Sequence, residues 1–146
     1  MDALDALKTR RSCRAYLDRP VDAQTLDAII EAGRFAASGM GRQSVTFVAV
    51  TDPATVKQLS RMNAQIMGVD TDPFYGAQTV VVVLADTSVL TCVEDGALAM
   101  GNLMNAAHAL GVDSCWIHRA REEFESEEGR ALLASWVFPP TDRCAA

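Results

Sequence analysis

Residues 88–110 read SVLTCVEDGALAMGNLMNAAHAL, and this stretch decides the fold. It predicts one helix of about 23 residues, which would extend about 34 Å. A single domain of this size has a radius of gyration of about 15 Å, so the helix should cross the whole domain. After Asp95 nearly every side chain is apolar or small, and a helix without a polar face is usually buried on every side. Because one small domain can hardly cover such a helix, we expect a subunit interface along it.

Shorter elements are predicted on either side of this helix. The apolar run at residues 79–85 predicts a central strand that is buried on both faces. Asp22 and Ser126 are candidate N-caps of two further helices, and Asp52 precedes the start of a short one. A helix is also predicted at residues 2–8, with strands at 46–51 and 114–118. Because strands and helices do not alternate regularly along the chain, the order favours an α+β fold over a doubly wound sheet.

The composition is that of a globular domain and argues against several classes of function. The chain has 146 residues, of which 49% are hydrophobic and 22% charged, as expected for one folded domain. A net charge of −6 disfavours nucleic-acid binding, and no apolar run is long enough for a membrane span. The N-terminus has no apolar leader, and the four cysteines show neither CxxC nor metal-ligand spacing. We therefore expect a cytoplasmic protein with reduced thiols, no metal, and no nucleic-acid or membrane partner.

Basic residues gather near the N-terminus of this acidic chain. Five of the 13 fall in the first 19 positions, and three of these lie in the run Arg10-Arg11-Ser12-Cys13-Arg14. A guanidinium group beside a hydroxyl suits a phosphate group or a polarised carbonyl edge. Short basic runs are also common at solvated helix ends, where arginine complements the helix dipole. Spacing alone leaves both interpretations open.

Other titratable residues carry weaker signals. The five glutamates between positions 122 and 128 have no histidine or cysteine among them, so we interpret them as a solvated helix start and not as a metal site. His118 is either an exposed residue at a strand end or a hydrogen-bonding partner for a substrate. Cys115 is interpreted as a small core residue, because no pattern of histidine and acid partners accompanies it.

Four motifs together resemble the FMN-dependent nitroreductase family, particularly its short single-domain members. They are RRSCRAY at residues 10–16, ASGMGRQS at 37–44, DPFYGA at 72–77, and DG at 95–96 leading to AAHALGVDSCWI at 106–117. The resemblance covers about residues 2–136. It implies a central mixed sheet flanked by helices, with the long helix in a homodimer interface.

The resemblance also implies the chemistry. FMN would bind at the dimer seam, with NAD(P)H as co-substrate, and a nitroaromatic, quinone or similar acceptor would be reduced in a ping-pong reaction by hydride transfer. The flavin would carry this chemistry, so no catalytic side chain is assigned. Arg10 and Ser12 would contact the phosphate and ribityl chain, and Arg14 would face the pyrimidine edge of the flavin. The full set of expected cofactor contacts is Arg10, Arg11, Ser12, Arg14, Ser38, Gly39, Gln43, Ile117, His118 and Arg119, with Phe74 and Tyr75 over the acceptor site.

The sequence also departs from the family pattern. Ala37, Gly41 and Val45 stand where family members usually have proline, asparagine and tryptophan, and Gly39 and Gly41 both tolerate a positive φ. After Trp136 the chain does not continue in the family pattern and contains two consecutive prolines, so its C-terminus looks truncated or altered. We therefore expect a flavin-binding domain at residues 1–136, a non-matching tail at 137–146, a missing final strand and an unpaired sheet edge. The alternative function is a catalytically impaired flavin-binding protein or a flavin-free binding protein of this family.

Overall fold

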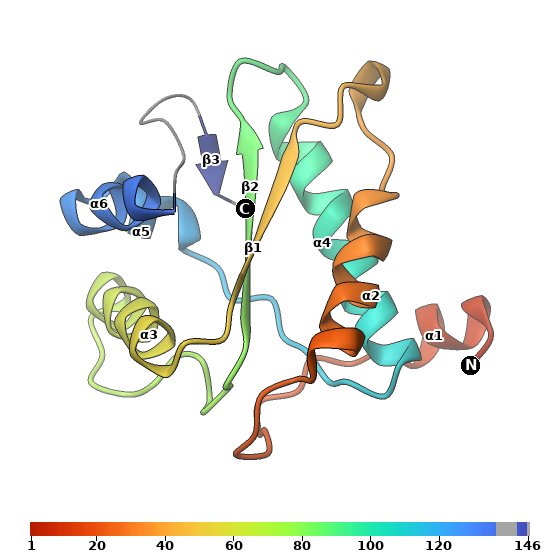
Figure 1. Cartoon of the computed structure of the whole chain (residues 1–146), viewed down its shortest axis with the longest axis horizontal. Helices are drawn as coiled ribbons and strands as arrows, with labels where there is room; N and C mark the ends of the chain where they lie inside the picture. The colour runs from red at the N-terminus through yellow and green to blue at the C-terminus, as the bar shows by residue number, and fades with distance from the viewer. Residues whose placement is uncertain (137–142, 146) are drawn as a thin grey trace.

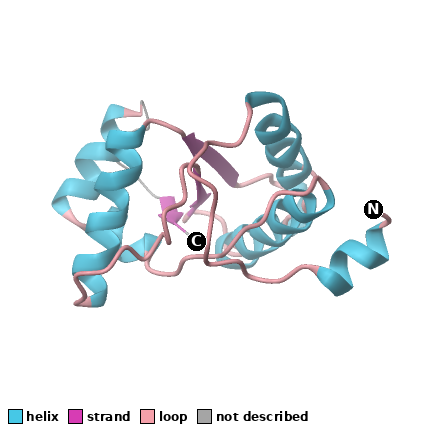
Figure 2. Cartoon of the chain, turned by 90° about the horizontal axis from the view of Figure 1, so that it is seen from below, coloured by secondary structure: helices cyan, strands magenta, loops and turns pink. Residues whose placement is uncertain are grey.

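A small antiparallel sheet lies between two groups of helices in the computed structural model, which describes residues 1–136 and 143–145. The elements in chain order are α1 (Ala3–Thr9), α2 (Ala23–Arg34), the 3-10 turn η1 (Gly39–Gly41), β1 (Val45–Val50), α3 (Pro53–Met67), β2 (Val80–Asp86), α4 (Cys92–Ala109), α5 (Ala120–Glu125), α6 (Glu127–Ser135) and β3 (Arg143–Ala145). Helices α2 and α4 lie on one side of the sheet, and α3, α5 and α6 lie on the other (Figure 1). Figure 2 shows the same two groups from below. The α+β class is confirmed.

Helices α2, α3 and α6 begin after the capping residues that the sequence predicts. The carboxylates of Asp22 and Asp52 accept hydrogen bonds from the backbone N–H groups of Thr25 and Thr55, and Ser126 caps α6 in the same way. These caps satisfy amide groups that have no partner inside the helix. The helix after Asp52 is longer than expected because α3 continues to Met67. Helix α5 was not predicted. No helix in the described part of the chain is both long and apolar enough to cross a membrane.

Strand β2 is central, as predicted, and its two faces join two separate cores. On the α3 side the buried cluster contains Val50, Val56, Leu59, Phe74, Val82, Leu84 and Phe124. On the α4 side it contains Ile29, Val83, Ala99, Leu103 and Ala107. Val82 and Leu84 therefore point to one core and Val83 to the other, as the alternation of side chains along a strand requires.

The sheet is antiparallel and not mixed, which corrects one expectation. β1 and β3 both run antiparallel to β2. The strand predicted at residues 114–118 does not form. That segment makes a single parallel bridge, from Ser114 to Ser12, since residues 115–117 lie along a groove beside β2 and not against its edge.

A short strand lies along part of the sheet edge that the sequence predicts to be unpaired. The short strand β3 pairs Ala145, Cys144 and Arg143 with Leu84, Ala85 and Asp86, so part of the expected open edge is covered. Residues 137–142 and 146 of the expected tail lie outside the described part of the chain. The division between a domain at 1–136 and a tail at 137–146 stays a prediction.

Helix α4 starts later than predicted and is covered on one face by its own chain. Turns between Asp86 and Cys92 delay its start, because Val89 N–H donates to the Asp86 carbonyl and Cys92 N–H to the Val89 carbonyl. Its buried residues follow helical spacing at Asp95, Gly96, Ala99, Leu103 and Ala107. On other faces Val93 is 60% exposed and Leu98 is 51% exposed. A single chain thus leaves apolar surface open on this helix, as the interface prediction requires.

Candidate functional site

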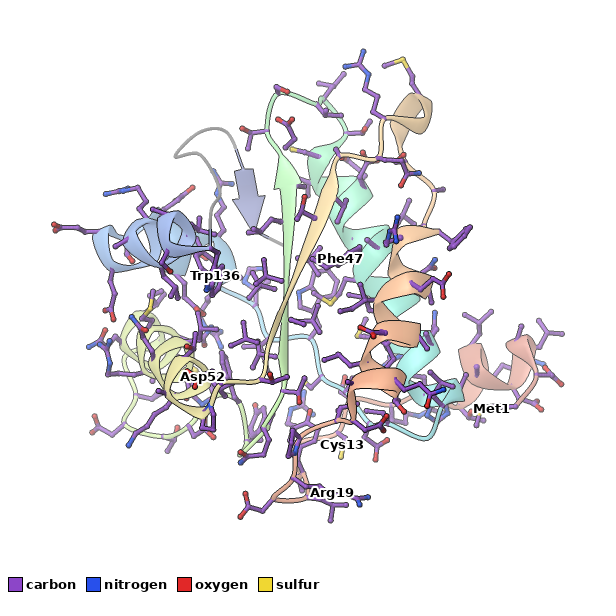
Figure 3. The ribbon with its side chains drawn as sticks, in the orientation of Figure 1. Met1, Cys13, Arg19, Phe47, Asp52 and Trp136 are labelled. Carbon is purple, nitrogen blue, oxygen red and sulfur yellow. The ribbon has the colours of Figure 1, made fainter. Side chains whose placement is uncertain are left out.

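The run Arg10–Arg14 leaves the end of α1 as an extended segment. Arg10 is the C-cap of α1, and Cys13 N–H donates to the Ser114 carbonyl at 3.0 Å, which joins this run to the segment after α4. The Arg11 guanidinium turns back, and its Nη1 donates to the carbonyls of Lys8 and Arg10 at 2.8 Å. Arg11 therefore fits the helix-end interpretation of the cluster. Figure 3 shows Cys13 at the same end of the molecule as Arg19.

Two polar groups on these joined segments have no hydrogen-bond partner among the residues that the structure describes. Arg10 Nη1 and Ser114 Oγ are buried and form no hydrogen bond within the described part of the chain. A buried polar group without a partner costs about 1–3 kcal/mol, and more when it is charged. A guanidinium N–H and a hydroxyl are also the donors that a phosphate accepts. These residues fit a phosphate-bearing cofactor such as FMN.

The loop from Ser38 to Ser44 is held by a residue that sequence reasoning missed as a site residue. Asp95 is 2% exposed, and its carboxylate accepts hydrogen bonds from Gly39 N–H and Ser44 Oγ at 2.8 Å each, and from Thr91 Oγ1 at 3.2 Å. The hydrogen bond from Gly39 N–H is the largest cause that lowers the pKa of Asp95. The sequence signal that pointed to Asp95 was an acidic residue in the first turn of an otherwise apolar helix.

The same loop stores backbone strain. Met40 (φ 54°) and Gln43 (φ 51°) adopt left-handed conformations that are uncommon for residues with a side chain. Gly41 has φ 66°, as expected, but Gly39 is needed for a different reason. A Cβ atom at Gly39 would lie 2.2 Å from Thr91 Oγ1, so this glycine allows the loop to approach α4 closely. Ser38 Oγ accepts from Gln43 N–H at 3.0 Å, which brings Ser38, Gly39 and Gln43 into one turn.

The neighbouring aromatic residues Phe74 and Tyr75 lie in one loop but in different environments. Asp72 accepts hydrogen bonds from the N–H groups of Phe74 and Gly76, which fixes a tight turn. Phe74 is buried in the core at 6% exposure, which corrects its expected place over the acceptor site. Tyr75 (φ 55°) is 41% exposed, and its ring centroid lies 5.9 Å from the Arg14 guanidinium carbon. The Arg14 guanidinium and the Tyr75 ring, which are far apart in the sequence, therefore form a cation–π contact.

A buried polar network supports residues 117–119. Asn63, which is 1% exposed, donates to the His118 carbonyl at 3.0 Å and to the Glu123 carboxylate, and accepts from Arg119 Nε at 3.0 Å. The Arg119 side chain is thus directed to α3, and its φ is 84°. His118 is exposed, whereas Ile117 is partly buried and packs against the α3-side core. The network fixes the backbone of this segment.

Glu123 is buried and not solvated, which corrects the interpretation of the glutamate run. It is 3% exposed, and burial raises its pKa to about 7 although Asn63 and Arg119 stabilise the carboxylate. No group of three or more histidine, cysteine, aspartate or glutamate residues within the described ranges is arranged to hold a metal ion.

The two halves of the expected cofactor site lie far apart within one chain. Gly39 is bonded to Asp95 near the start of α4, whereas Thr9 beside Arg10 lies 2.9 Å from His108 Nε2 near the end of the helix. About 13 residues of helix separate Asp95 from His108, which corresponds to about 20 Å. The chain therefore does not bring the Arg10–Arg14 run and the Ser38–Gln43 turn together.

Comparisons with known proteins agree on one family. Residues 7–126 match the model of the nitroreductase family. A putative NADH dehydrogenase/NAD(P)H nitroreductase of Methanothermobacter thermautotrophicus is 29% identical over 125 residues, which are 80% of this chain and 60% of that protein. An FMN reductase [NAD(P)H] of Bacillus subtilis is 29% identical, over 99% of this chain and 68% of that protein. The chain thus spans about two thirds of the length of these two relatives.

A solved structure is similar over nearly the whole chain. A Bacteroides fragilis nitroreductase crystallised with FMN has a TM-score of 0.88 and 30% identity, covering 99% of this chain and 83% of that one.

Proposed function

Because the chain belongs to the nitroreductase family, we propose that it is an FMN-dependent oxidoreductase that passes electrons from NAD(P)H to a small-molecule acceptor. Nitroaromatics and quinones are the proposed acceptors. The observation that carries the proposal is a pair of buried donors without a partner among the described residues, Arg10 Nη1 and Ser114 Oγ, in two of the motifs that carry the family resemblance. Bound FMN supplies the hydride chemistry, and the protein supplies placement and electrostatics.

Each part of the site has a proposed role. Arg10 and Ser12 bind the cofactor phosphate and ribityl chain, with the Ser114 hydroxyl as a further donor. Arg14, held beside the Tyr75 ring, supplies a positive charge that stabilises negative charge on the bound cofactor. The Asn63 network holds the backbone of residues 117–119 in place for the cofactor ring. Tyr75 is the proposed aromatic neighbour of the acceptor.

A homodimer is part of this proposal. The separation of about 20 Å between the Arg10–Arg14 run and the Ser38–Gln43 turn means that one chain supplies only half of each site. A second copy, docked on the open face of α4 around Val93 and Leu98, would supply the other half. The prediction of two equivalent FMN sites per dimer follows.

The first test is the visible absorbance spectrum of the purified protein during titration with FMN and then with NAD(P)H. We expect a flavin band at one FMN per chain, its loss on addition of NAD(P)H, and its return with an added quinone. FMN binding without bleaching by either nucleotide would support the impaired alternative. Absence of any FMN binding would refute the proposal in favour of a flavin-free binding protein.

A further inference from the structure

Two cysteines that are far apart in the sequence come together where the N-terminal segment pairs with the segment after α4. Ser12 and Ser114 form a parallel bridge, and the Cys13 N–H group donates to the Ser114 carbonyl at 3.0 Å (Figure 1). In parallel pairing the two segments advance in step, so Cys13 comes opposite Cys115 one residue further on. Neighbouring strands lie about 4.8 Å apart, and a disulfide bond needs about 4.4–6.8 Å between its two Cα atoms. The backbone spacing at this pair therefore suits a disulfide bond.

The two thiols lie on the side of the paired segments that faces away from the Ser114 hydroxyl. Successive side chains of an extended segment alternate between two faces, so the two cysteines share the face opposite the bridged serines. Burial, and next the neighbouring thiols of Cys115 and Cys13, raise the pKa of the Tyr16 phenol to about 12. Both sulfur atoms therefore lie near one hydroxyl group, as thiols on a shared face would. The thiol pair is distinct from the proposed phosphate site, which uses the Ser114 hydroxyl on the other face.

The segments around the pair can adjust to the geometry of a disulfide bond. Their pairing is a single bridge, and the Cys13 carbonyl accepts a hydrogen bond from the Tyr16 hydroxyl at 2.7 Å instead of extending a ladder. Both cysteines are free and partly buried. Each thiol donates to a carbonyl of its own segment, at 3.2 Å from Cys13 to Ala15 and at 3.8 Å from Cys115 to Trp116. Thiols are weak donors, so rotation about χ1 can release both sulfur atoms.

We propose that Cys13 and Cys115 form a reversible dithiol–disulfide pair that responds to the redox state of low-molecular-weight thiols. The Cys13 thiolate attacks one sulfur of a disulfide such as oxidised glutathione, which releases one glutathione thiolate and leaves a mixed disulfide on Cys13. The Cys115 thiolate then attacks the Cys13 sulfur and displaces the second glutathione thiolate. The two protons lost by the cysteines pass to the released thiolates, so two molecules of reduced glutathione form for each intramolecular disulfide bond. The proposal is independent of the proposed flavin function.

The disulfide bond would join two distant parts of the chain. About 100 residues separate the two cysteines, and a cross-link that closes a loop of this length reduces the entropy of the unfolded chain. Only one thiol has to meet the oxidant, because the second reacts within the chain. We expect the midpoint of urea denaturation to rise by about 1 M or more in the oxidised protein.

The test incubates the folded full chain with mixtures of oxidised and reduced glutathione. Free thiols are then blocked with iodoacetamide, and the peptides are mapped by mass spectrometry without reduction. We expect the Cys13 peptide to be linked to the Cys115 peptide, the intact chain to lose two hydrogen atoms, and dithiothreitol to reverse both changes. The linkage should form at least about tenfold faster in the folded chain than in concentrated urea, because folding holds the two thiols together.

Serine variants separate the two steps of the exchange. Cys115→Ser should retain one glutathione on Cys13, because no second thiol displaces it. Cys92→Ser is the matched control, since this thiol is also free and partly buried, and it should form the disulfide bond as the wild type does. Circular dichroism confirms that each variant is folded, and the wild-type rates in buffer and in urea do not depend on the variants.

Four outcomes would overturn the proposal. The first is that Cys13 and Cys115 both remain alkylated after oxidation of the folded chain. The second is a linkage of either residue to Cys92 or Cys144. The third is equal rates of linkage in buffer and in urea, and the fourth is a linkage found only between two chains on a non-reducing gel.

Discussion

Glu123 makes the stability of this protein depend on pH in an unusual direction. Its carboxyl group is buried at the start of α5, and burial raises its pKa to about 7 from the ordinary value of 4.5. A group whose pKa is higher in the folded state binds its proton more tightly there than in the unfolded chain. Its contribution to stability is therefore complete below about pH 4.5 and is lost as the pH rises through about 7.

The size of this effect follows from the shift. The difference between 4.5 and about 7 corresponds to about 3 kcal/mol at 1.36 kcal/mol per pKa unit. Screening by water around the short helix α5 reduces this, and we expect about 1.5 kcal/mol. Glu123→Gln keeps an oxygen that accepts from Asn63 but cannot ionise. We therefore expect this variant to match the wild type at pH 4.5 and to be about 1.5 kcal/mol more stable at pH 8.5.

Urea denaturation at half-unit intervals from pH 4.5 to 8.5 measures the difference. Glu122→Gln is the matched control, because this neighbouring side chain is exposed and its removal should change stability by less than about 0.5 kcal/mol at every pH. The reasoning is refuted if the free energies of unfolding of Glu123→Gln and the wild type run parallel across this range. Parallel curves would mean that the Glu123 carboxylate is hydrated in the folded protein and that its pKa is not raised.

Three further variants test the core and the cofactor site. Leu59→Ala removes a side chain that is 1% exposed and should lower the free energy of unfolding by about 3 kcal/mol in urea denaturation; a loss below about 1 kcal/mol would contradict the packing described. Arg10→Ala should weaken FMN binding at least tenfold in a fluorescence titration, whereas Arg11→Ala should weaken it less, and equal losses would argue against Arg10 as the phosphate ligand. Gly39→Ala should also raise the Kd for FMN at least tenfold, because its Cβ would collide with Thr91; an unchanged Kd would show that the loop position does not matter.

Local features of the fold were accessible from the sequence. Asp22, Asp52 and Ser126 cap helices within three residues of their own position, so their effect can be seen in a short window. The apolar run around Val82 predicts a buried strand because side chains alternate between two faces. The motif resemblance led to the nitroreductase family because its residues occur in the expected order, and residues 7–126 match that family.

Other features depended on contacts between distant parts of the chain. Asp95 binds Gly39, and Glu123 binds Asn63, across 56 and 60 residues of sequence. No local pattern distinguishes these buried acids from the solvated acids beside them, because burial depends on which helix packs above them. The same reason explains why the predicted strand at residues 114–118 formed only one bridge.

The sequence by itself determined the starts of α2, α3 and α6, the central valine strand and the family, because each depends on neighbouring residues or on a motif in order. Only the tertiary structure decided that Phe74 belongs to the core, that the Arg11 guanidinium donates to carbonyls at the end of α1, and that Arg10 Nη1 is buried without a partner in the described chain. These outcomes depend on which surfaces come together when the chain folds, and desolvation then gives chemically similar residues different roles.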